Sequence, residues 1–391
     1  MHRLDYVGEQ FVKDCGVLQV GNYRFIQLDV FTNQPFAGNP LAVFPEAEGL
    51  SDEQMMKIAR EMNLSETVFV LRPEESKQQS VNSKQPTANS EQSTANGQQQ
   101  ESESEEQSAN DIAQTSEGEA QRVGSAIPQS EIRNPKFPLR RLRIFTPVRE
   151  IPFAGHPIVG SWNALAREGI VPLPEGGNGW TRIHHEVGIG ILPVDIEFKD
   201  GAPVQVVMTQ GKFEILAEIE DGNEQAELAR ALGRDRDDLD ENLPIQVIST
   251  GLSSLAVPIR SLADLGTCRV NSSLLGELYT QHGATGCHAF SRETIEIADA
   301  RAHARFFAPA DNIAEDPATG SASGALGGYL IHHGASGIEP VDGRYKFVIE
   351  QGDFMHRPSR INLDVGGKPG AVEEVRVGGP SVVVARGEVY V

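Results

Sequence analysis

The sequence predicts an α+β fold built from two domains of related build that face each other across a cleft. The length of 391 residues is sufficient for two ordinary domains. Each half also shows strands, then a helix that opens on glycine, then more strands, and a polar segment interrupts only the first half. A cleft between two such domains is the default position for a small ligand.

The first half begins with two expected strands, at 23–31 and 41–44, joined by a loop rich in glycine and proline. A short helix follows. Ser51 is a good N-cap for it, Gln54 stands at the capping-box position, and the apolar residues fall on one face. These apolar residues are Met55, Ile58, Ala59 and Met62.

Two strands, expected at 67–71 and 139–146, flank a segment of different character. Residues 74–135 are dominated by Gln, Ser, Glu, Asn, Ala and Thr and predict a disordered insert that contributes nothing to a core. Because the cost of closing a loop grows only logarithmically with its length, the flanking strands can still pair as neighbours. A helix at about 157–167 and strands at 182–185, 189–197 and 204–208 complete this half.

The second half repeats the pattern with a helix at 224–232, strands at 245–250 and 255–259, and a largely helical stretch over 262–278. Strands at 287–291 and 302–307 precede a glycine-rich helix at 320–332 and a closing series of strands. These elements divide the chain into an extension, 1–22, a first domain, 23–212, and a second domain, 213–372. The last strands, 373–391, are expected to return to the first domain.

Composition narrows the class of protein. A net charge of −21 and a pI near 4.9 argue against general binding to nucleic acid or to anionic membranes, since both reward basic surfaces. The three cysteines, Cys15, Cys268 and Cys287, are widely spaced and indicate neither a disulfide framework nor a zinc site. Without a membrane-length apolar run or a signal-peptide core, the expected location is the cytoplasm.

The two helix openings, at Gly155 and Gly320, leave backbone N–H groups unpaired and direct the positive end of the helix dipole at an approaching anion. Each lies beside a titratable residue, His156 in the first and Asp316 before the second. The two openings therefore suggest a carboxylate held between two related halves. Close packing of two helices in a core is the plain alternative for either motif alone.

Three residues are candidates for acid–base chemistry. Glu66 stands where a loop meets an apolar strand, and a carboxyl held in an apolar cleft has its pKa raised towards neutrality. His156 and Asp316 join it, although a solvated glutamate, a capping histidine and a turn aspartate are their ordinary roles. No cofactor motif is present, and the pairs 184–185 and 332–333 lack the spacing of helical metal ligands. These three residues are best suited to a reaction that removes a proton from one carbon atom and returns a proton to another.

Five motifs in order carry a family resemblance. They are FAGNP at 36–40, LSET at 64–67, FAGHP at 153–157, EDPATGSA at 315–322 and EQG at 350–352. Together they resemble the PhzF-like isomerases of phenazine biosynthesis over essentially residues 23–391, the insert excepted. The resemblance implies a fold like that of diaminopimelate epimerase, with two pseudo-symmetric domains. In each, a β-barrel-like sheet would surround a central helix, the two helices being those that open at Gly155 and Gly320.

The resemblance also implies roles for particular residues. Glu66 matches the general acid/base that moves a proton between ring carbons of trans-2,3-dihydro-3-hydroxyanthranilate without a cofactor or metal. His156 and Asp316 match residues that orient the substrate and assist the proton transfer. The backbone N–H groups of Gly320 and Ser321 match those that hold its carboxylate, and Asn39 and Gly155 complete the expected substrate-binding set.

The resemblance has one departure and leaves alternatives open. His356 stands where the family commonly has glycine, so the loop there is expected to differ. None of the cysteines falls in a motif, which argues against the two-thiol mechanism of the epimerase relatives. The residues and the resemblance together predict a cofactor-independent isomerase of a small carboxylate-bearing metabolite. The protein is expected to be a homodimer. An amino-acid racemase or epimerase is the alternative enzyme, and a non-catalytic interaction protein that uses the insert is the alternative of another class.

Overall fold

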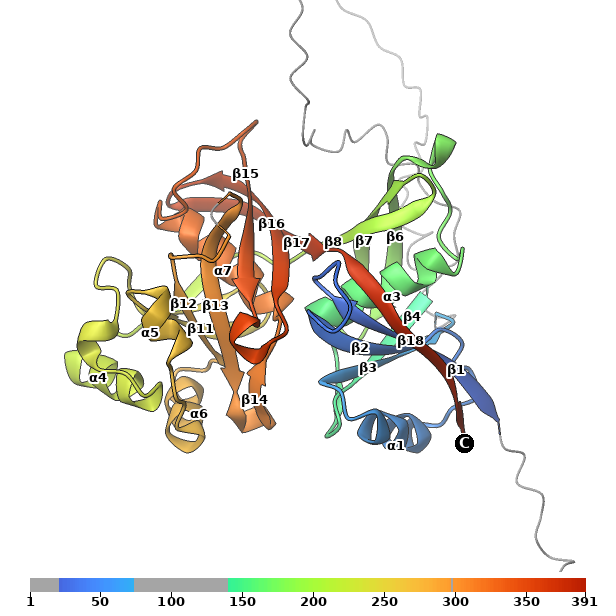
Figure 1. The fold of residues 1–391 in the computed structure, drawn as a ribbon, viewed down its shortest axis with the longest axis horizontal. Coiled ribbons are helices and arrows are strands. Elements are labelled where there is room, and N and C mark those ends of the chain that lie inside the picture. The colour runs from blue at the N-terminus through green and yellow to red at the C-terminus, as the bar shows by residue number, and fades with distance from the viewer. Residues whose placement is uncertain (1–20, 74–139, 297) are drawn as a thin grey trace, which may run out of the picture.

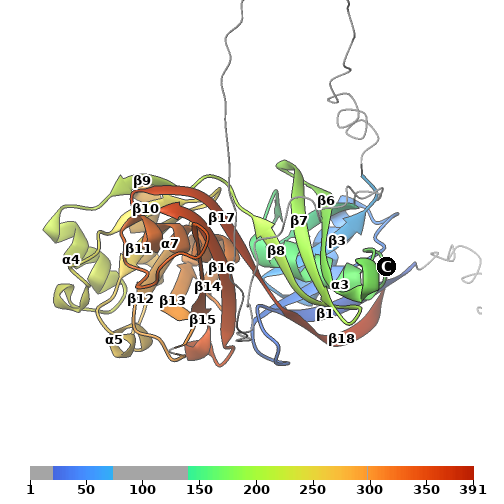
Figure 2. The ribbon, with the colours of Figure 1, turned by 90° about the horizontal axis from the view of Figure 1, so that it is seen from above.

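The protein folds into two lobes, each a curved sheet around one central helix (Figures 1 and 2). The structure, a computed structural model, describes residues 21–73, 140–296 and 298–391. The predicted insert, 74–135, and all but the last two residues of the predicted extension, 1–22, therefore lie outside the described residues. The first lobe contains β1 (Asn22–Val30), β2 (Asn39–Phe44), α1 (Asp52–Met62), β3 (Glu66–Leu71), β4 (Arg140–Phe145), β5 (Glu150–Ile151), α3 (Gly155–Arg167), β6 (Gly179–Val187), β7 (Gly190–Lys199), β8 (Ala202–Thr209) and the last strand, β18 (Ser381–Tyr390).

The second lobe follows β8 in the chain and is joined to the first by strand β17 (Figure 1). Its elements are β9 (Glu214–Glu218), α4 (Gly222–Ala231), β10 (Gln246–Ser249), β11 (Ser253–Pro258), α5 (Leu262–Gly266), α6 (Ser272–Gln281), β12 (Cys287–Ser291), β13 (Ala300–Ala308), β14 (Ile313–Asp316), α7 (Gly320–His332), β15 (Arg344–Gln351), β16 (Ser359–Lys368) and β17 (Ala371–Gly379). Short 3-10 turns lie at Glu175–Gly177, Arg236–Asp238, Pro309–Asp311 and Asp353–Met355.

The two lobes repeat one topology. In the first, β1 and β2 are antiparallel, β2 and β3 parallel, β3 and β4 antiparallel, and β4 and β6 parallel across α3. In the second, the same alternation runs through β10, β11, β12, β13 and β15, with α7 in the position of α3. The predicted pairing of the strands on either side of the insert is thereby confirmed. Pseudo-symmetry puts the openings of α3 and α7 in equivalent places.

The two central helices form because their sequences are apolar or small on every side, which is the pattern of a helix enclosed by protein. Every residue of α3 from Gly155 to Ala166 is buried. Glycines allow the strands to approach closely: a Cβ on Gly160 would lie 2.6 Å from Leu41 Cδ2, and one on Gly327 would lie 2.3 Å from Leu363 Cδ1. The sheet of each lobe can therefore close tightly around its helix.

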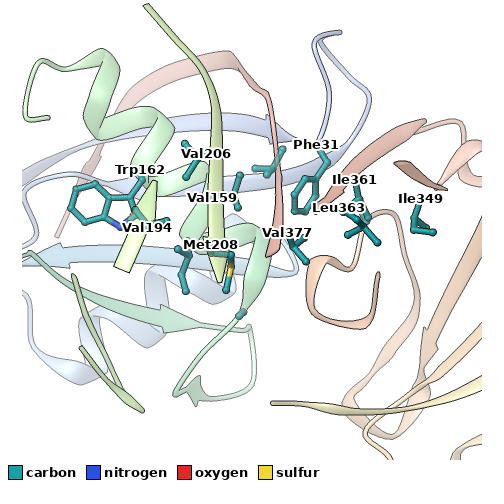
Figure 3. Close-up of a cluster of buried hydrophobic side chains, with 14 of the residues drawn as sticks. Phe31, Val159, Trp162, Val194, Val206, Met208, Ile349, Ile361, Leu363 and Val377 are labelled. Carbon is teal, nitrogen blue, oxygen red and sulfur yellow. The ribbon is translucent and has the colours of Figure 1, made fainter. Parts of the chain in front are cut away.

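The largest buried core is shared between the lobes (Figure 3). It runs from Trp162 and Met208 in the first lobe, past Phe31 and Val377, to Ile349 in the second. Backbone pairing follows the same path, because β17 pairs with β16 on one side and with β8 on the other. Strand β18 then pairs with β1 along its whole length, so the chain ends in the lobe where it began.

The stretch 262–278 is largely helical, as predicted, but it forms two helices, α5 and α6. Asn271 caps the second through a hydrogen bond from Leu274 N and thereby starts a new helix. The backbone between them also turns aside, with Arg269 N donating to Leu232 O at 2.9 Å. The short strands β5, β9 and β14 were not predicted, and Asp316 ends a strand rather than starting a turn.

The departure at His356 has a local explanation. His356 has φ 58° and ψ 28° at the end of a 3-10 turn, in the left-handed region that favours glycine. The His356 side chain is exposed there. In a separate respect, no helix of the described residues is long and apolar enough to cross a bilayer.

Candidate active site

The candidate residues come together where the openings of the two central helices meet. Glu66 is the first residue of β3, Asn39 the first of β2, His156 lies in the first turn of α3, and Asp316 ends β14 just before α7. All four side chains are buried, with exposed fractions of 8% for Glu66, 5% for His156, 6% for Asp316 and 0% for Asn39. Residues 277 positions apart in the chain thus form one cluster.

Asn39 connects the members of this cluster. Its Oδ1 accepts a hydrogen bond from Ser65 Oγ at 3.1 Å, and its Nδ2 donates to Asp316 Oδ1 and to Ala318 O, each at 2.9 Å. Nδ2 also lies 3.2 Å from His156 Nδ1. Since an amide nitrogen can only donate, one of the two Asn39 amide protons is shared with His156 Nδ1, and the proton of the neutral ring is left on Nε2.

Glu66 and His156 face each other in this cluster. His156 Nε2 lies 3.2 Å from Glu66 Oε2, at an angle that makes no hydrogen bond, and neither atom has another partner among the described residues. Burial raises the pKa of Glu66 to about 8, and the nearby Asp316 charge adds to that rise, while Ser65 opposes it. Burial lowers the pKa of His156 to about 3. Glu66 can therefore hold or release a proton near neutral pH.

Asp316 is held by Asn39, which the sequence analysis named, and by Thr319, which it did not. Burial raises its pKa, and hydrogen bonds from Thr319 Oγ1 and Asn39 oppose that rise. Gln351 supports this loop, with Nε2 donating to Asp316 O at 2.7 Å and Oε1 accepting from Thr319 N at 3.1 Å. Ser65, Thr319 and Gln351 all lie inside the recognised motifs, so the motifs were the signal that could have identified them.

The two helix openings adjoin in space. A Cβ on Gly155 would lie 3.2 Å from Ser321 N and 3.5 Å from Gly320 Cα. The N-cap residues, Ala154 and Thr319, make no side-chain hydrogen bond to the first turns that follow them. The structure therefore brings Gly155, Gly320 and Ser321 together beside Glu66, with two positive helix ends directed at one place.

A cavity of about 670 Å³ opens onto this cluster from the space between the lobes. Glu66, His156, Asp316, Gly320 and Ser321 line it, together with residues from both lobes. Asn39 lies behind this lining and supports it. Cys268 and Cys287 are buried away from the cavity, and burial raises the pKa of each thiol, that of Cys268 to about 11. Among the described residues no group of three His, Cys, Asp or Glu side chains is placed to hold a metal.

Strands that enclose two buried helices, with a cluster of titratable side chains where the helices meet, form the α+β, epimerase-like fold of an isomerase family. The chain belongs to the family described as Phenazine biosynthesis-like protein, whose family model matches residues 28–88 and 110–387. It is 31% identical over 369 residues to an uncharacterized isomerase of Clostridium acetobutylicum, covering 94% of this chain and 98% of that protein. It is 30% identical over 370 residues to trans-2,3-dihydro-3-hydroxyanthranilate isomerase of Pseudomonas aeruginosa, covering 94% and 99%.

Solved structures agree with this assignment. A phenazine biosynthesis protein of the PhzF family from Bacillus anthracis is 25% identical and superimposes with a TM-score of 0.67, covering 95% of this chain and 100% of that one. A hydroxyproline epimerase from Agrobacterium vitis is only 10% identical, with a TM-score of 0.52 and coverage of 94% and 92%, and shares the fold alone. The predicted fold class and family are confirmed.

Proposed function

We propose that this isomerase moves a proton between two carbons of a small carboxylate-bearing metabolite without a cofactor, and that Glu66 takes the proton and returns it. The observation that carries the proposal is a buried carboxyl group with a pKa raised to about 8, at the inner end of a cavity lined by two helix openings. A group with a pKa near the working pH serves both as base and as acid, which a single-residue proton transfer requires.

The remaining residues have supporting roles in this proposal. The backbone N–H groups of Gly320 and Ser321 bind the substrate carboxylate at the positive end of α7, and Gly155 allows α3 to approach them. His156, uncharged with a proton on Nε2, orients Glu66 and the substrate. Asp316 holds Asn39 and the α7 loop in place. Glu66 takes a proton from one carbon, electron density shifts along the unsaturated system, and Glu66 then delivers a proton, which can exchange with solvent while it is on the carboxyl group, to another carbon.

The geometry favours isomerisation over two-base racemisation. A racemase of that type needs a base on each face of the stereocentre, whereas Glu66 Oε2 and His156 Nε2 lie only 3.2 Å apart. The two described cysteines lie away from the cavity, so they supply no thiol pair. We propose a substrate like trans-2,3-dihydro-3-hydroxyanthranilate, the compound for which the Pseudomonas aeruginosa relative is named. A homodimer, expected from the family, is testable by light scattering.

The proposal is tested by following deuterium from solvent into trans-2,3-dihydro-3-hydroxyanthranilate and its product by NMR. We expect the wild-type protein to move a proton between carbons and Glu66→Gln to lower that rate by at least about 10²-fold, as for other general acid–base groups. Glu61→Gln, an exposed change in α1, is the matched control and should leave the rate unchanged. Undiminished proton transfer in Glu66→Gln would contradict the proposal.

The same measurement separates the alternatives. Deuterium at a single carbon with inversion of that centre would support a racemase instead. If Glu66→Gln is silent in cells while deletion of residues 74–135 removes the biological effect, an interaction protein that uses the insert is the better description.

A further inference from the structure

The outer part of the cavity, beyond the acid–base cluster, has apolar walls contributed by both lobes. Val148 comes from the turn after β4 and Leu252 from the turn between β10 and β11, and both line the cavity. They are large apolar side chains with exposed fractions of 56% and 39%. Phe306 and Ile313 continue the wall on the second lobe. A ligand that reaches this part removes apolar surface from water.

The only lysine or arginine among the described residues that line the cavity is Arg149, next to Val148. Its Nη2 lies 2.9 Å from Asp311 Oδ1, across the mouth of the cleft. The two residues come from different lobes, and both line the cavity. The positive charge of Arg149 is therefore already matched before a ligand enters.

Two further carboxylates line the cavity, and each is bound by an arginine outside its lining. Arg143 binds both oxygens of Glu150, and Arg305 binds both oxygens of Glu315. The outer cavity thus carries carboxylates that are paired and one arginine that is also paired. It offers no unmatched positive charge from the part of the chain that the structure describes.

We propose that the Arg149–Asp311 ion pair determines substrate specificity: it selects acids with one carboxylate and an uncharged, apolar far end, and rejects acids with a second anionic group there. This inference rests on the proposed function, which puts the first carboxylate at the α7 opening. A second carboxylate would have to displace Asp311 from Arg149 and lose its hydration beside paired carboxylates. An apolar group only displaces water from Val148 and Leu252.

The test compares binding of benzoate and terephthalate, which differ by one carboxylate at the far end of the same ring. Isothermal titration at low ionic strength gives the affinity ratio for the wild-type protein, for Asp311→Asn and for Asp311→Asn/Arg149→Gln. We expect the wild type to prefer benzoate, and Asp311→Asn to shift the ratio about three- to fivefold towards terephthalate, the range of one exposed ion pair. The double variant should lose that gain, because it no longer has the arginine.

A second pair of variants tests the apolar wall of the outer cavity. Leu252→Asn should weaken benzoate binding about threefold, at the low end of what losing a buried apolar contact costs, and should leave acetate binding unchanged because acetate does not reach the outer cavity. Leu216→Asn, at an exposed leucine on strand β9 that does not line the cavity, is the matched change and should affect neither acid. An unchanged benzoate affinity in Leu252→Asn would contradict an apolar subsite.

The outcomes distinguish this inference from the proposed function. If benzoate binds and the Glu66-dependent proton transfer is present, but the ratio does not respond to Asp311→Asn, the specificity inference alone is overturned. If terephthalate binds the wild type as tightly as benzoate, it is also overturned. If neither acid binds the wild type, the carboxylate site of the proposed function fails and the inference fails with it.

Discussion

At the scale of single residues, the site contains two buried carboxyl groups with different surroundings. Asp316 accepts hydrogen bonds on both oxygens, from Asn39 and Thr319, which stabilise its charged form. Glu66 Oε2 has no such donor within the described chain, and the neighbouring Asp316 charge raises its pKa further. Two like charges in one apolar site oppose each other, so Asp316 ionises first and Glu66 keeps its proton to a higher pH.

This difference predicts a pH dependence of activity. Because Glu66 must be deprotonated to act as a base, kcat/KM should rise with pH and level off above the Glu66 pKa of about 8. Stopped-flow absorbance over a range of pH measures it. A plateau reached already near 4.5, the ordinary value for glutamate, would contradict this assignment.

The Glu66 carboxyl group also affects the stability of the fold, which should fall as the pH rises, whereas the activity should increase. Since its folded-state pKa is raised above 4.5, the folded state binds the Glu66 proton more tightly than the unfolded state. The resulting stabilisation is complete below pH 4.5 and is lost as the pH rises through about 8. Glu66→Gln should remove this loss of stability at high pH. Urea denaturation of the wild type and of Glu66→Gln at matched pH values measures the difference.

The chemistry of the site residues could be predicted from the sequence only in part. Nothing in the spacing of Asn39, Glu66, His156 and Asp316 brings them together, because their meeting depends on pairings such as Leu41 opposite Glu66 across parallel strands. The motif resemblance supplied what spacing could not. Even so, the motifs do not reveal that Asn39 contacts four partners or that Gln351 supports the α7 loop.

At the scale of elements, the adjoining openings of α3 and α7 are the feature on which carboxylate binding depends. Gly155→Ala would introduce a Cβ 3.2 Å from Ser321 N, closer than ordinary contact, so the two openings must move apart. We expect KM for the substrate to rise about tenfold, since small displacements in a site are costly. The free energy of unfolding should change by less than about 1 kcal/mol. Steady-state kinetics and urea denaturation measure the two effects.

Gly276→Ala in α6 is the control for this change. It is also a glycine within a helix, but the nearest atom to its Cβ is Pro309 Cγ at an ordinary 3.7 Å. It should stabilise the protein by up to about 1 kcal/mol and leave KM unchanged. An unchanged KM in Gly155→Ala would show that the separation of the helices does not matter.

Helices and strands with a strong local sequence pattern were predicted well, and those with a weak pattern were missed. The helix after Ser51 was predicted well because its capping box and apolar face agree, and both are present in the structure. Strand β9, with Ile215 and Leu216 largely exposed, has little buried face to produce an alternating pattern. The break between α5 and α6 depends on a capping hydrogen bond from Asn271, which apolar periodicity does not register.

At the scale of the whole molecule, the lobes are joined by a common core and a continuous sheet rather than by a flexible linker. Val377 on β17 belongs both to the common core and to the continuous sheet. It is buried, packs against the glycines of α7 in the second lobe, and stands opposite Met208 of the first lobe in the β8–β17 pairing. We infer that the two lobes unfold together.

This inference predicts the effect of a single cavity at the junction. Val377→Ala should lower the free energy of unfolding by about 2 kcal/mol, the cost of removing buried methyl groups. Amide hydrogen exchange should become faster in both lobes, because both lose the same contacts. Val204→Ala, at an exposed site on β8, should change the stability by less than about 0.5 kcal/mol. Faster exchange confined to one lobe would contradict joint unfolding.

The pairing of β1 with β18 also determines how the molecule would respond to mechanical tension. Gly21 and Val391 are hydrogen-bonded to each other, and Asn22 lies opposite Tyr390. Force applied at residues 21 and 391 would therefore load one rung of the ladder at a time, as in opening a zipper. Rupture would begin at the surface and proceed towards Val30 and Ser381, reaching the shared core as Ile26 and Leu28 lost their partners on β18. Breaking one rung at a time takes less force than breaking all rungs together, so this end of the molecule would yield first.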